Sequence, residues 1–251
     1  MKKIGIVTAL VLAVSLISSG CTGNSEPAPQ PEPEPVNGIV TEIPWPDHEF
    51  STYAIQDSDG NEIGIVGLTI AREIGDTYIL KQFYGFKHQV GSLLTLATVR
   101  ADNLKPVSGI LTLSDVSPAP VIEYRFDNNT LTIKARDTEG NVKHHTIDIP
   151  EDTYDDNELL FLLRTIPFKI GYTTSFTNVI AAATQKHAVT ITVVSEEQLQ
   201  VPAGIFDAYK IELSIAGDKK YLWYSKDELH YLLKLDDGSN LFLLEEVTEE
   251  I

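Results

Sequence analysis

Cysteine, basic charge and long apolar runs are all scarce in this 251-residue sequence. Its single cysteine, Cys21, leaves no partner for a disulfide within the chain. The apolar stretch at residues 4–17 is shorter than the roughly 20 residues that a membrane-spanning helix needs. Lys and Arg number 19 against 36 Asp and Glu, which gives a formal net charge of −17. This charge argues against binding to nucleic acid and against a body that lies flat on an anionic membrane.

Motifs for catalysis and metal binding are also missing. The sequence contains no HExxH metal motif, no GxSxG nucleophile elbow and no phosphate-binding glycine loop. His144 and His145 are adjacent in a predicted strand, so their side chains face opposite ways and cannot share one metal ion. The Asp57-x-Asp59-Gly60 stretch lacks the later calcium ligands of an EF-hand and is better explained as a hairpin turn. We predict a non-enzymatic protein without a cofactor or a metal site.

The N-terminus has the organisation of an export signal. A basic head, Lys2-Lys3, precedes the apolar stretch, and small residues lead to Gly20 and Cys21. This stretch resembles the bacterial lipoprotein signal, in which cleavage between Gly20 and Cys21 would leave a lipid-modified cysteine as the new N-terminus. The resemblance implies a lipid attachment at Cys21 and explains why a lone cysteine is present. The alternative is a general secretory signal with an incidental cysteine.

The sequence divides into three parts. Residues 1–20 form the predicted signal peptide, and residues 21–40 follow as an anchor cysteine with a spacer rich in Pro and Glu. Such a spacer cannot bury apolar area, and proline favours extended geometry, so we expect it to lift the body off the membrane. Residues 41–251 are long enough for one β domain with a sizeable core.

Alternating strands separated by tight turns dominate the body. Within residues 130–136, 189–193 and 209–215, apolar side chains alternate with polar ones, which is typical of strands with one buried face. Asp-Gly and Gly-Asn pairs between these segments supply the positive φ angles of hairpins. We predict a mainly β fold, with a single antiparallel, strongly curved sheet or open half-barrel.

One segment, near residues 156–165, predicts a short buried helix. Asp155 and Glu158 have the spacing of a capping box, an almost entirely apolar stretch follows, and Pro167 ends the helix. Helix capping accounts for the acidic residues between 152 and 158, with a weak calcium site as the alternative. The helix is expected to fill the concave face of the sheet, or else to act as a movable lid over an apolar pocket. Any ligand there should contact Leu160, Phe161, Leu163 and Trp223.

The C-terminal half is similar to a known family. The stretch VPAGIFDAYK at residues 201–210 and the stretch LWYS at residues 222–225 resemble the DUF3108 family of exported bacterial β proteins. The resemblance implies a mostly β fold and brings no established activity. In the first of these stretches, Pro202 and Gly204 read as a turn between two strands.

Taken together, these features predict an extracytoplasmic lipoprotein of a bacterial cell membrane or outer membrane. Its concave face is expected to bind a lipid, another apolar ligand or a partner chain, without catalysis. One alternative is an envelope scaffold that has a filled core and binds a protein partner through its outer surface. Another is a hydrolase, which would need a cluster of titratable groups in a cleft.

Overall fold

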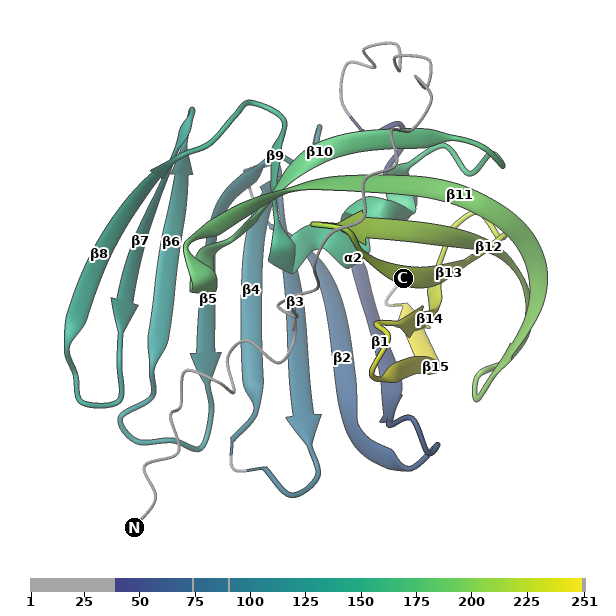
Figure 1. Ribbon diagram of the computed structural model, residues 1–251, viewed down its shortest axis with the longest axis horizontal. Coiled ribbons are helices and arrows are strands. Elements are labelled where there is room, and N and C mark those ends of the chain that lie inside the picture. Colours follow the sequence, from purple (N-terminus) through teal and green to yellow (C-terminus); the bar gives the residue numbers. More distant parts are fainter. Residues whose placement is uncertain (1–38, 74, 90, 250–251) are drawn as a thin grey trace, which may run out of the picture.

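A computed structural model describes residues 39–73, 75–89 and 91–249. The predicted signal peptide, Gly20, Cys21 and nearly all of the predicted spacer lie outside these residues. The described chain forms one sheet of 15 strands (Figure 1). It also contains a short α-helix flanked by turns of 3-10 helix. The predicted mainly β class is therefore confirmed.

The strands follow one another along the chain with short connections. In order they are β1 (His48–Gln56), β2 (Glu62–Glu73), β3 (Thr77–Phe86), β4 (Leu93–Arg100), β5 (Pro106–Leu113), β6 (Val121–Asp127), β7 (Thr130–Arg136), β8 (Val142–Asp148), β9 (Thr153–Asp155), β10 (Thr173–Ile180), β11 (Gln185–Val201), β12 (Gly204–Ile215), β13 (Asp218–Ser225), β14 (Leu232–Asp236) and β15 (Leu241–Glu249). The helical elements are η2 (Asp156–Glu158), α2 (Leu159–Leu162), η3 (Leu163–Thr165) and η4 (Ala181–Ala183).

Hairpin pairing sets the order of the strands in the sheet. From edge to edge it runs β8-β7-β6-β5-β4-β3-β2-β1-β15-β14-β13-β12-β11-β10-β9. The first and last strands of the body, β1 and β15, are antiparallel neighbours, so the two ends of the domain meet in the middle of the sheet. All pairs are antiparallel except β9 with β10. Strands β8 and β9 remain as two free edges, which confirms the prediction of an open sheet.

The turns occur where the sequence predicts them. Residues 57–61 join β1 to β2, and residues 216–217 join β12 to β13. In the first turn the Asp57 carboxylate accepts hydrogen bonds from the backbone nitrogens of Asp59 and Asn61, which fixes the loop. The VPAGIFDAYK stretch forms the hairpin between β11 and β12, where Gly204 has a φ of +144°. This is the structural turn that the sequence indicates.

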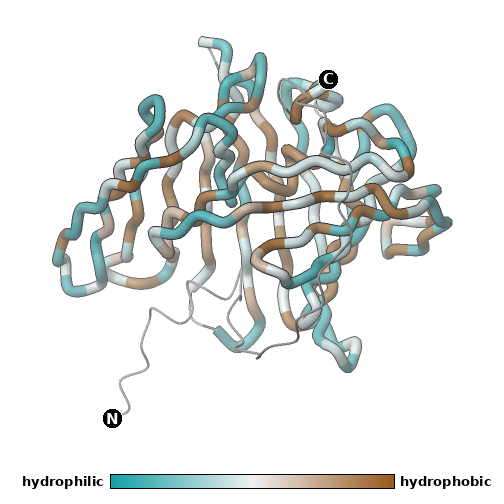
Figure 2. Tube along the Cα trace, turned by 45° about the horizontal axis from the view of Figure 1, so that its top comes forward, coloured by the Kyte–Doolittle hydropathy of each residue, from teal (hydrophilic) through white to brown (hydrophobic). Residues whose placement is uncertain are grey.

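Strong curvature folds one half of the sheet over the other. In Figure 1, strands β2 to β8 run roughly vertically, whereas β10 to β12 cross them nearly horizontally. The long strand β11 changes register between Val193 and Ser195, and such bulges increase the bend of a strand. Val179 of β10 and Ala181 of η4 belong to one apolar cluster with Leu131 and Ile133 of β7. Figure 2 shows hydrophilic residues gathered at the turns and hydrophobic ones along the strands.

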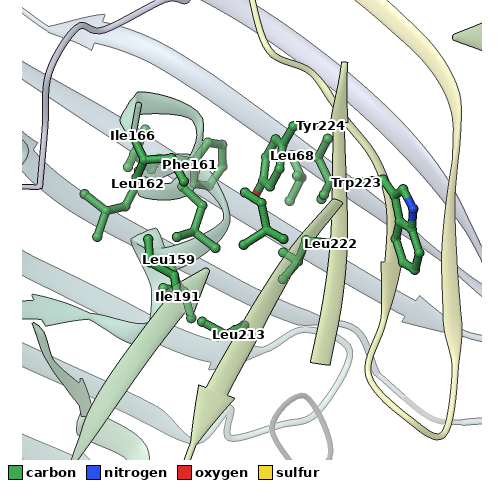
Figure 3. Packing of buried hydrophobic residues seen from close by; sticks show 14 of the residues in the cluster. Leu68, Leu159, Phe161, Leu162, Ile166, Ile191, Leu213, Leu222, Trp223 and Tyr224 are labelled. Carbon is green, nitrogen blue, oxygen red and sulfur yellow. The ribbon is translucent and has the colours of Figure 1, made fainter. Parts of the chain in front are cut away.

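The helical segment 156–165 lies in the space between the two halves. Its capping box is present, because the Asp155 side chain caps the helix while the Glu158 side chain accepts from the Asp155 backbone nitrogen. Phe161, Leu162 and Leu163 are buried in the main core. Figure 3 shows the helix side chains facing Leu213, Leu222 and Tyr224 of strands β12 and β13. The predicted short buried helix is thus confirmed.

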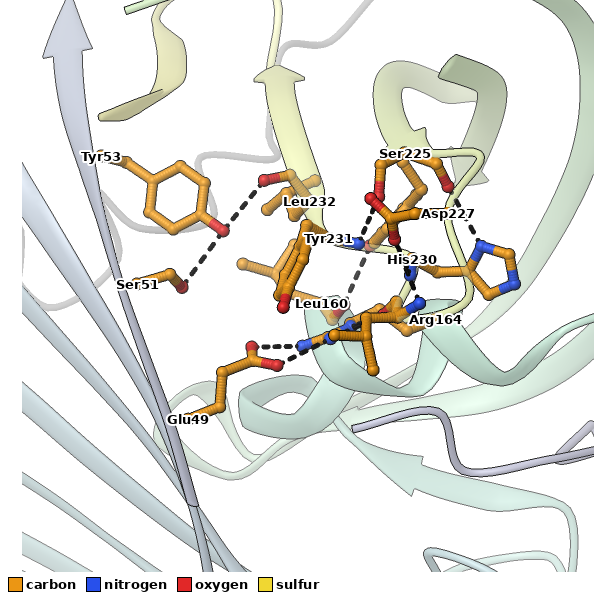
Figure 4. A network of polar contacts seen from close by, with 12 residues as sticks. Glu49, Ser51, Tyr53, Leu160, Arg164, Ser225, Asp227, His230, Tyr231 and Leu232 are labelled. Atoms are coloured by element: carbon orange, nitrogen blue, oxygen red, sulfur yellow. Dashed lines mark hydrogen bonds and ion pairs between the residues drawn. The ribbon is translucent and has the colours of Figure 1, made fainter. Parts of the chain in front are cut away.

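A buried ion pair fixes the helical segment to the first strand. Arg164 donates to both carboxylate oxygens of Glu49, at 2.6 and 2.9 Å, and both side chains are at most 5% exposed (Figure 4). The Arg164 guanidinium also donates to the Leu229 carbonyl and lies 5.3 Å from the centre of the Trp45 ring. Both charged groups therefore have hydrogen-bonding partners inside the core.

We expect Arg164→Met to lower the free energy of unfolding by about 3–5 kcal/mol, because it leaves the Glu49 carboxylate buried without a partner. The double variant Glu49→Met/Arg164→Met should lose less than the single variant. Urea denaturation of the three proteins measures this. Arg100→Met is the control, because Arg100 pairs with Asp102 at the surface, where a loss of at most about 1 kcal/mol is expected. Equal losses for the control and Arg164→Met would contradict the assignment.

Candidate functional site

A cavity of about 220 Å³ remains between the helical segment and the concave face of the sheet. Its walls come from both halves of the sheet and from the start of the helix. The lining is mostly aliphatic, and its apolar members are Leu93, Leu111, Leu159, Leu160, Ile180, Ala181, Ala182, Ala183, Leu213, Ile215, Leu222 and Leu235. Such a surface excludes water and favours an apolar occupant.

Strand alternation places these aliphatic side chains inside. In β4, the buried positions are Leu93, Thr95, Ala97 and Val99, every second residue. Leu213 and Ile215 occupy the same face of β12, which crosses opposite. Two inward faces of one sheet therefore form walls of the cavity, and Leu159 and Leu160 of the helix also line it.

One part of the cavity wall is polar. Tyr84 donates a hydrogen bond to the Gln82 side-chain oxygen at 2.5 Å, and the Gln82 amide nitrogen donates to the Asn157 carbonyl at 2.5 Å. Thr95 lies directly across the strand pair from Gln82 and also lines the cavity. Through Gln82, this polar wall connects strand β3 to the first helical turn.

Next to this wall, the side chain of Asp155, which caps the helix, is buried together with its hydrogen-bond partner Tyr124. The Tyr124 hydroxyl donates to the Asp155 carboxyl at 2.5 Å, and the Asn157 amide nitrogen donates to the Tyr124 hydroxyl at 2.8 Å. Burial is the main reason that the pKa of Asp155 is raised to about 7, against the lowering effect of the Tyr124 hydrogen bond. Burial also raises the pKa of Glu158 well above its usual value, and the neighbouring Asp155 adds to this. Both carboxyls therefore bind a proton more tightly in the fold than they do in water.

Asp156 brings a third carboxyl to the cavity lining. It accepts a hydrogen bond of 2.8 Å from the Asn178 amide. Burial raises the pKa of Asp156, and the Asn178 hydrogen bond and the nearby Lys220 and His187 oppose the rise. Lys220 and His187 also line the cavity, so its lining contains one acidic and two basic side chains.

The four residues predicted to bind a ligand do not all line the cavity. Leu160 lines the cavity, whereas Phe161 and Leu163 are buried in the solid part of the core. Trp223 points away from the helix in Figure 3, on the opposite side of β13 from Leu222. There its ring nitrogen donates to Glu197, and the Lys210 and Lys234 ammonium groups lie over its ring. Of the four predicted residues, only Leu160 contacts the cavity.

Sequence reasoning missed the polar wall. Gln82 and Tyr84 of β3 and Thr95 of β4 occupy inward positions among aliphatic residues. The available signal was a polar residue at a position that the period of two assigns to the buried face. Strand β3 reads TYILKQFYGF, in which Gln82 falls in the alternate positions shared with Tyr78, Leu80 and Tyr84.

Within residues 39–73, 75–89 and 91–249, no group of three or more His, Cys, Asp or Glu side chains is placed to hold a metal ion. In the same described residues, no helix combines the length and apolar character needed to cross a bilayer. The acidic residues between 152 and 158 are instead occupied by capping and hydrogen bonds, as their sequence spacing indicates.

Comparison with known proteins identifies a family and a shared fold. The model of a family described as "Protein of unknown function (DUF3108)" matches residues 56–241. A beta-barrel-like protein of the DUF1849 family from Brucella abortus has a TM-score of 0.51 at 11% identity, over 85% of this chain and 99% of that chain. That likeness shows a common fold alone. No curated protein matches the chain.

Two further solved structures are only loosely similar. One is a candidate lipoprotein from Parabacteroides distasonis, with a TM-score of 0.33 at 12% identity over 85% of this chain and 100% of that chain. The other is a candidate exported protein with a YmcC-like fold from Bacteroides fragilis, with a TM-score of 0.34 at 12% identity over 84% and 100% of the two chains. These superpositions carry no argument about this protein's role.

The buried carboxyls predict that stability falls as the pH rises. The folded protein keeps the Asp155 proton up to about pH 7, whereas the unfolded chain releases it near pH 4, so folding takes up a proton between these values. The free energy of unfolding should therefore decrease from pH 4 to pH 7, by up to about 1.4 kcal/mol per pH unit for this group. Chemical denaturation at several pH values measures the slope.

Asp155→Asn should flatten this decrease while preserving a good helix cap. Asp218→Asn is the control, because Asp218 is exposed at the start of β13. The control should keep the slope of the wild type. A curve for Asp155→Asn parallel to that of the wild type would show that Asp155 does not carry the proton uptake.

Proposed function

The chain belongs to the DUF3108 family, whose model covers more than half of it, and from this premise we propose that it is a membrane-anchored binding protein for an apolar ligand. The ligand occupies the cavity between the helical segment and the concave face. The protein performs no chemistry on it. It acts outside the cytoplasm, attached through a lipid on Cys21.

The observation that carries this proposal is the aliphatic cavity itself. A scaffold that works only through its outer surface needs a filled interior, and this interior has a space of about 220 Å³. An engineered apolar cavity of about 150 Å³ is known to bind benzene, so the space here is adequate for one aromatic ring or a short alkyl chain. The volume of this cavity is below the roughly 300–1,000 Å³ of pockets that bind drug-sized ligands. The ligand is therefore small, or only one end of it enters.

The sequence supports the proposed location. The basic head, the apolar stretch and the small residues before Cys21 match a lipoprotein signal, and the Pro/Glu-rich spacer separates the anchor from the body. One acyl chain holds a protein only marginally, so we expect more than one chain on the processed N-terminus. The acidic body, repelled by anionic lipid, stays in the aqueous phase.

Filling the cavity should abolish binding. Ala182→Phe places a ring in the lining, whereas Ala188→Phe adds the same ring to an exposed position of β11. Calorimetric titration with p-xylene should show at least about a tenfold weaker affinity for Ala182→Phe and no change for Ala188→Phe. Saturable binding that survives in Ala182→Phe would place the ligand elsewhere, and no binding to the wild type would refute the proposal.

The anchor has its own test. Growth of a bacterial host with radiolabelled palmitate should label the wild-type chain and leave Cys21→Ala unlabelled. The wild type should sediment with membranes after a high-salt wash. Label on Cys21→Ala, or release of the wild type by salt alone, would contradict lipid attachment at this cysteine.

A further inference from the structure

Apolar side chains are exposed on the outer face of the sheet, the face that points away from the helical segment. Phe50, Ile65 and Ile110 are 40–46% exposed, although each lies within a strand. The Phe50 ring lies over Gly67, where an added Cβ would be 3.2 Å from the ring and 4.0 Å from the Phe83 Cβ. Phe50 nevertheless stays 45% exposed. Packing within the sheet therefore leaves these side chains partly uncovered.

These residues belong to one continuous apolar patch on strands β1 to β5. Its members are Phe50, Ile65, Phe83, Leu94, Leu96 and Ile110. Ile65 and Phe83 meet over Gly85, where an added Cβ would lie 3.6 Å from the first side chain and 3.4 Å from the second. Phe83 also lies directly opposite Leu94 in the adjacent strand. A contiguous exposed apolar surface of this kind marks an interaction site in a soluble domain.

Charged residues are scarce around this patch. The described strands β3, β4 and β5 contain only two, Lys81 and Arg100, and neither is acidic. Arg100 is paired with Asp102, whereas no ion pair joins Lys81 to another described residue. The chain as a whole has 36 acidic and 19 basic residues. Two copies of so acidic a protein repel each other over much of their surface, and these strands lack the acidic side chains that cause this repulsion.

One row of outward side chains crosses the patch from strand to strand. In the pairing of β3, β4, β5 and β6, its members are Lys81, Leu96, Ile110 and Glu123. Two aliphatic residues thus form the centre of the row, with a base at one end and an acid at the other. Both charged side chains are exposed, and Glu123 uses only one carboxylate oxygen for its ion pair with Lys134. Lys81 and Glu123 are therefore accessible to a partner.

This row is complementary to itself about a two-fold axis. In an interface between two identical copies, residue i of one copy contacts residue j of the other, and the reverse contact forms as well. An axis along the strands, between β4 and β5, places Lys81 opposite Glu123 of the second copy. The same axis places Leu96 opposite Ile110. Face-to-face packing of two sheets with aligned strands permits this arrangement, so one row supplies two ion pairs around an apolar centre.

The neighbouring row has the same property. Its members in the same four strands are Phe83, Leu94, Thr112 and Val121. The axis between β4 and β5 places Phe83 opposite Val121 of the second copy, so apolar side chains meet and neither row brings like charges together. Strands β4 and β5 also lie in the middle of the series β1 to β8. The apolar contacts therefore fall at the centre of the interface, where binding energy is concentrated.

We propose that two copies of this chain form a symmetric dimer through the outer face of β3 to β6, in which Lys81 of each copy pairs with Glu123 of the other across a two-fold axis between β4 and β5. The interface uses none of the residues that line the cavity. The dimer goes beyond the proposed binding function and does not depend on it, so either one stands if the other fails.

Zero-length crosslinking tests the central contact in the full mature chain, reconstituted in liposomes. A carbodiimide joins a lysine amine to a carboxylate only where the two groups touch. Within one copy, Lys81 and Glu123 are three strand spacings apart, about 14 Å, which is too far. A mixture of light and heavy isotope-labelled chains should therefore yield a mixed-label peptide that joins Lys81 to Glu123. The crosslink between Lys134 and Glu123, whose charged atoms lie 2.9 Å apart, is the internal control. That control without any mixed-label Lys81 peptide overturns the proposed contact.

Charge reversal tests the same contact by affinity. Sedimentation equilibrium of the mature chain in density-matched detergent gives the dissociation constant of the dimer. Lys81→Glu and Glu123→Lys should each weaken the dimer by about tenfold or more, because each brings like charges together twice. The double variant Lys81→Glu/Glu123→Lys restores opposite charges and should recover the affinity to within about threefold. Lys219→Glu makes the same change of charge at a surface ion pair of β13 and should change the constant by less than about twofold.

The apolar centre has a matched pair of variants. Ile110→Ser should weaken the dimer by about tenfold, whereas Ile205→Ser, at a residue of β12 that is 63% exposed, should leave it unchanged. Urea denaturation checks that each variant folds. A wild type that stays monomeric over the whole concentration series overturns the proposal. So does a dimer in which the two serine variants act alike, or in which the double charge reversal stays as weak as the single ones.

Discussion

The arrangement of the whole domain depends on how a ten-residue helical segment is held inside an open sheet. An open curved sheet has no closing hydrogen bonds between its edges, so the relation of its two halves must come from what lies between them. Arg164 fixes this segment to the middle of the sheet, because its guanidinium reaches Glu49 of β1 and the Leu229 carbonyl of the connection between β13 and β14. The two side chains are almost completely buried, so each charge requires the other to be in place. The position of the helix, and with it the cavity, follows from this requirement.

Much of the fold could be predicted from the sequence, because local signals determine it. Alternation and Asp-Gly turns define strands such as Thr130–Arg136, and the capping box with the apolar run that follows defines the helix. The sequence could not give the bend of β11 or the way β10 crosses β7, because these depend on a register shift and on packing between distant segments. For the same reason Leu160 was identified together with Phe161 and Leu163, although only Leu160 reaches the cavity. When a helix is buried on all sides, the sequence does not show which of its faces lines a cavity.

The polar groups of the site have two different relations to stability. Asp155, Tyr124 and Asn157 form a connected hydrogen-bonded set that shapes the start of the helix. Raised carboxyl pKa values are the consequence of burying that set. Such a shift at a helix cap is explained by structure alone and does not require catalysis. Thr95 is different, since its hydroxyl makes no hydrogen bond within the described residues. The first set stabilises the start of the helix, whereas the Thr95 hydroxyl is buried without a compensating hydrogen bond.

A ligand in this cavity would also contribute to the closure of the sheet. The lining joins β3, β4 and β5 on one side to β10, β12 and β13 on the other, and the two sides are connected here by side chains and the helix rather than by a strand ladder. An occupant that contacts both sides binds the folded domain and not the unfolded chain, so its binding free energy adds to the stability of the fold. The cavity therefore lies where an occupant would strengthen the contact between the two halves. This coupling follows from the open topology and does not require any group to move.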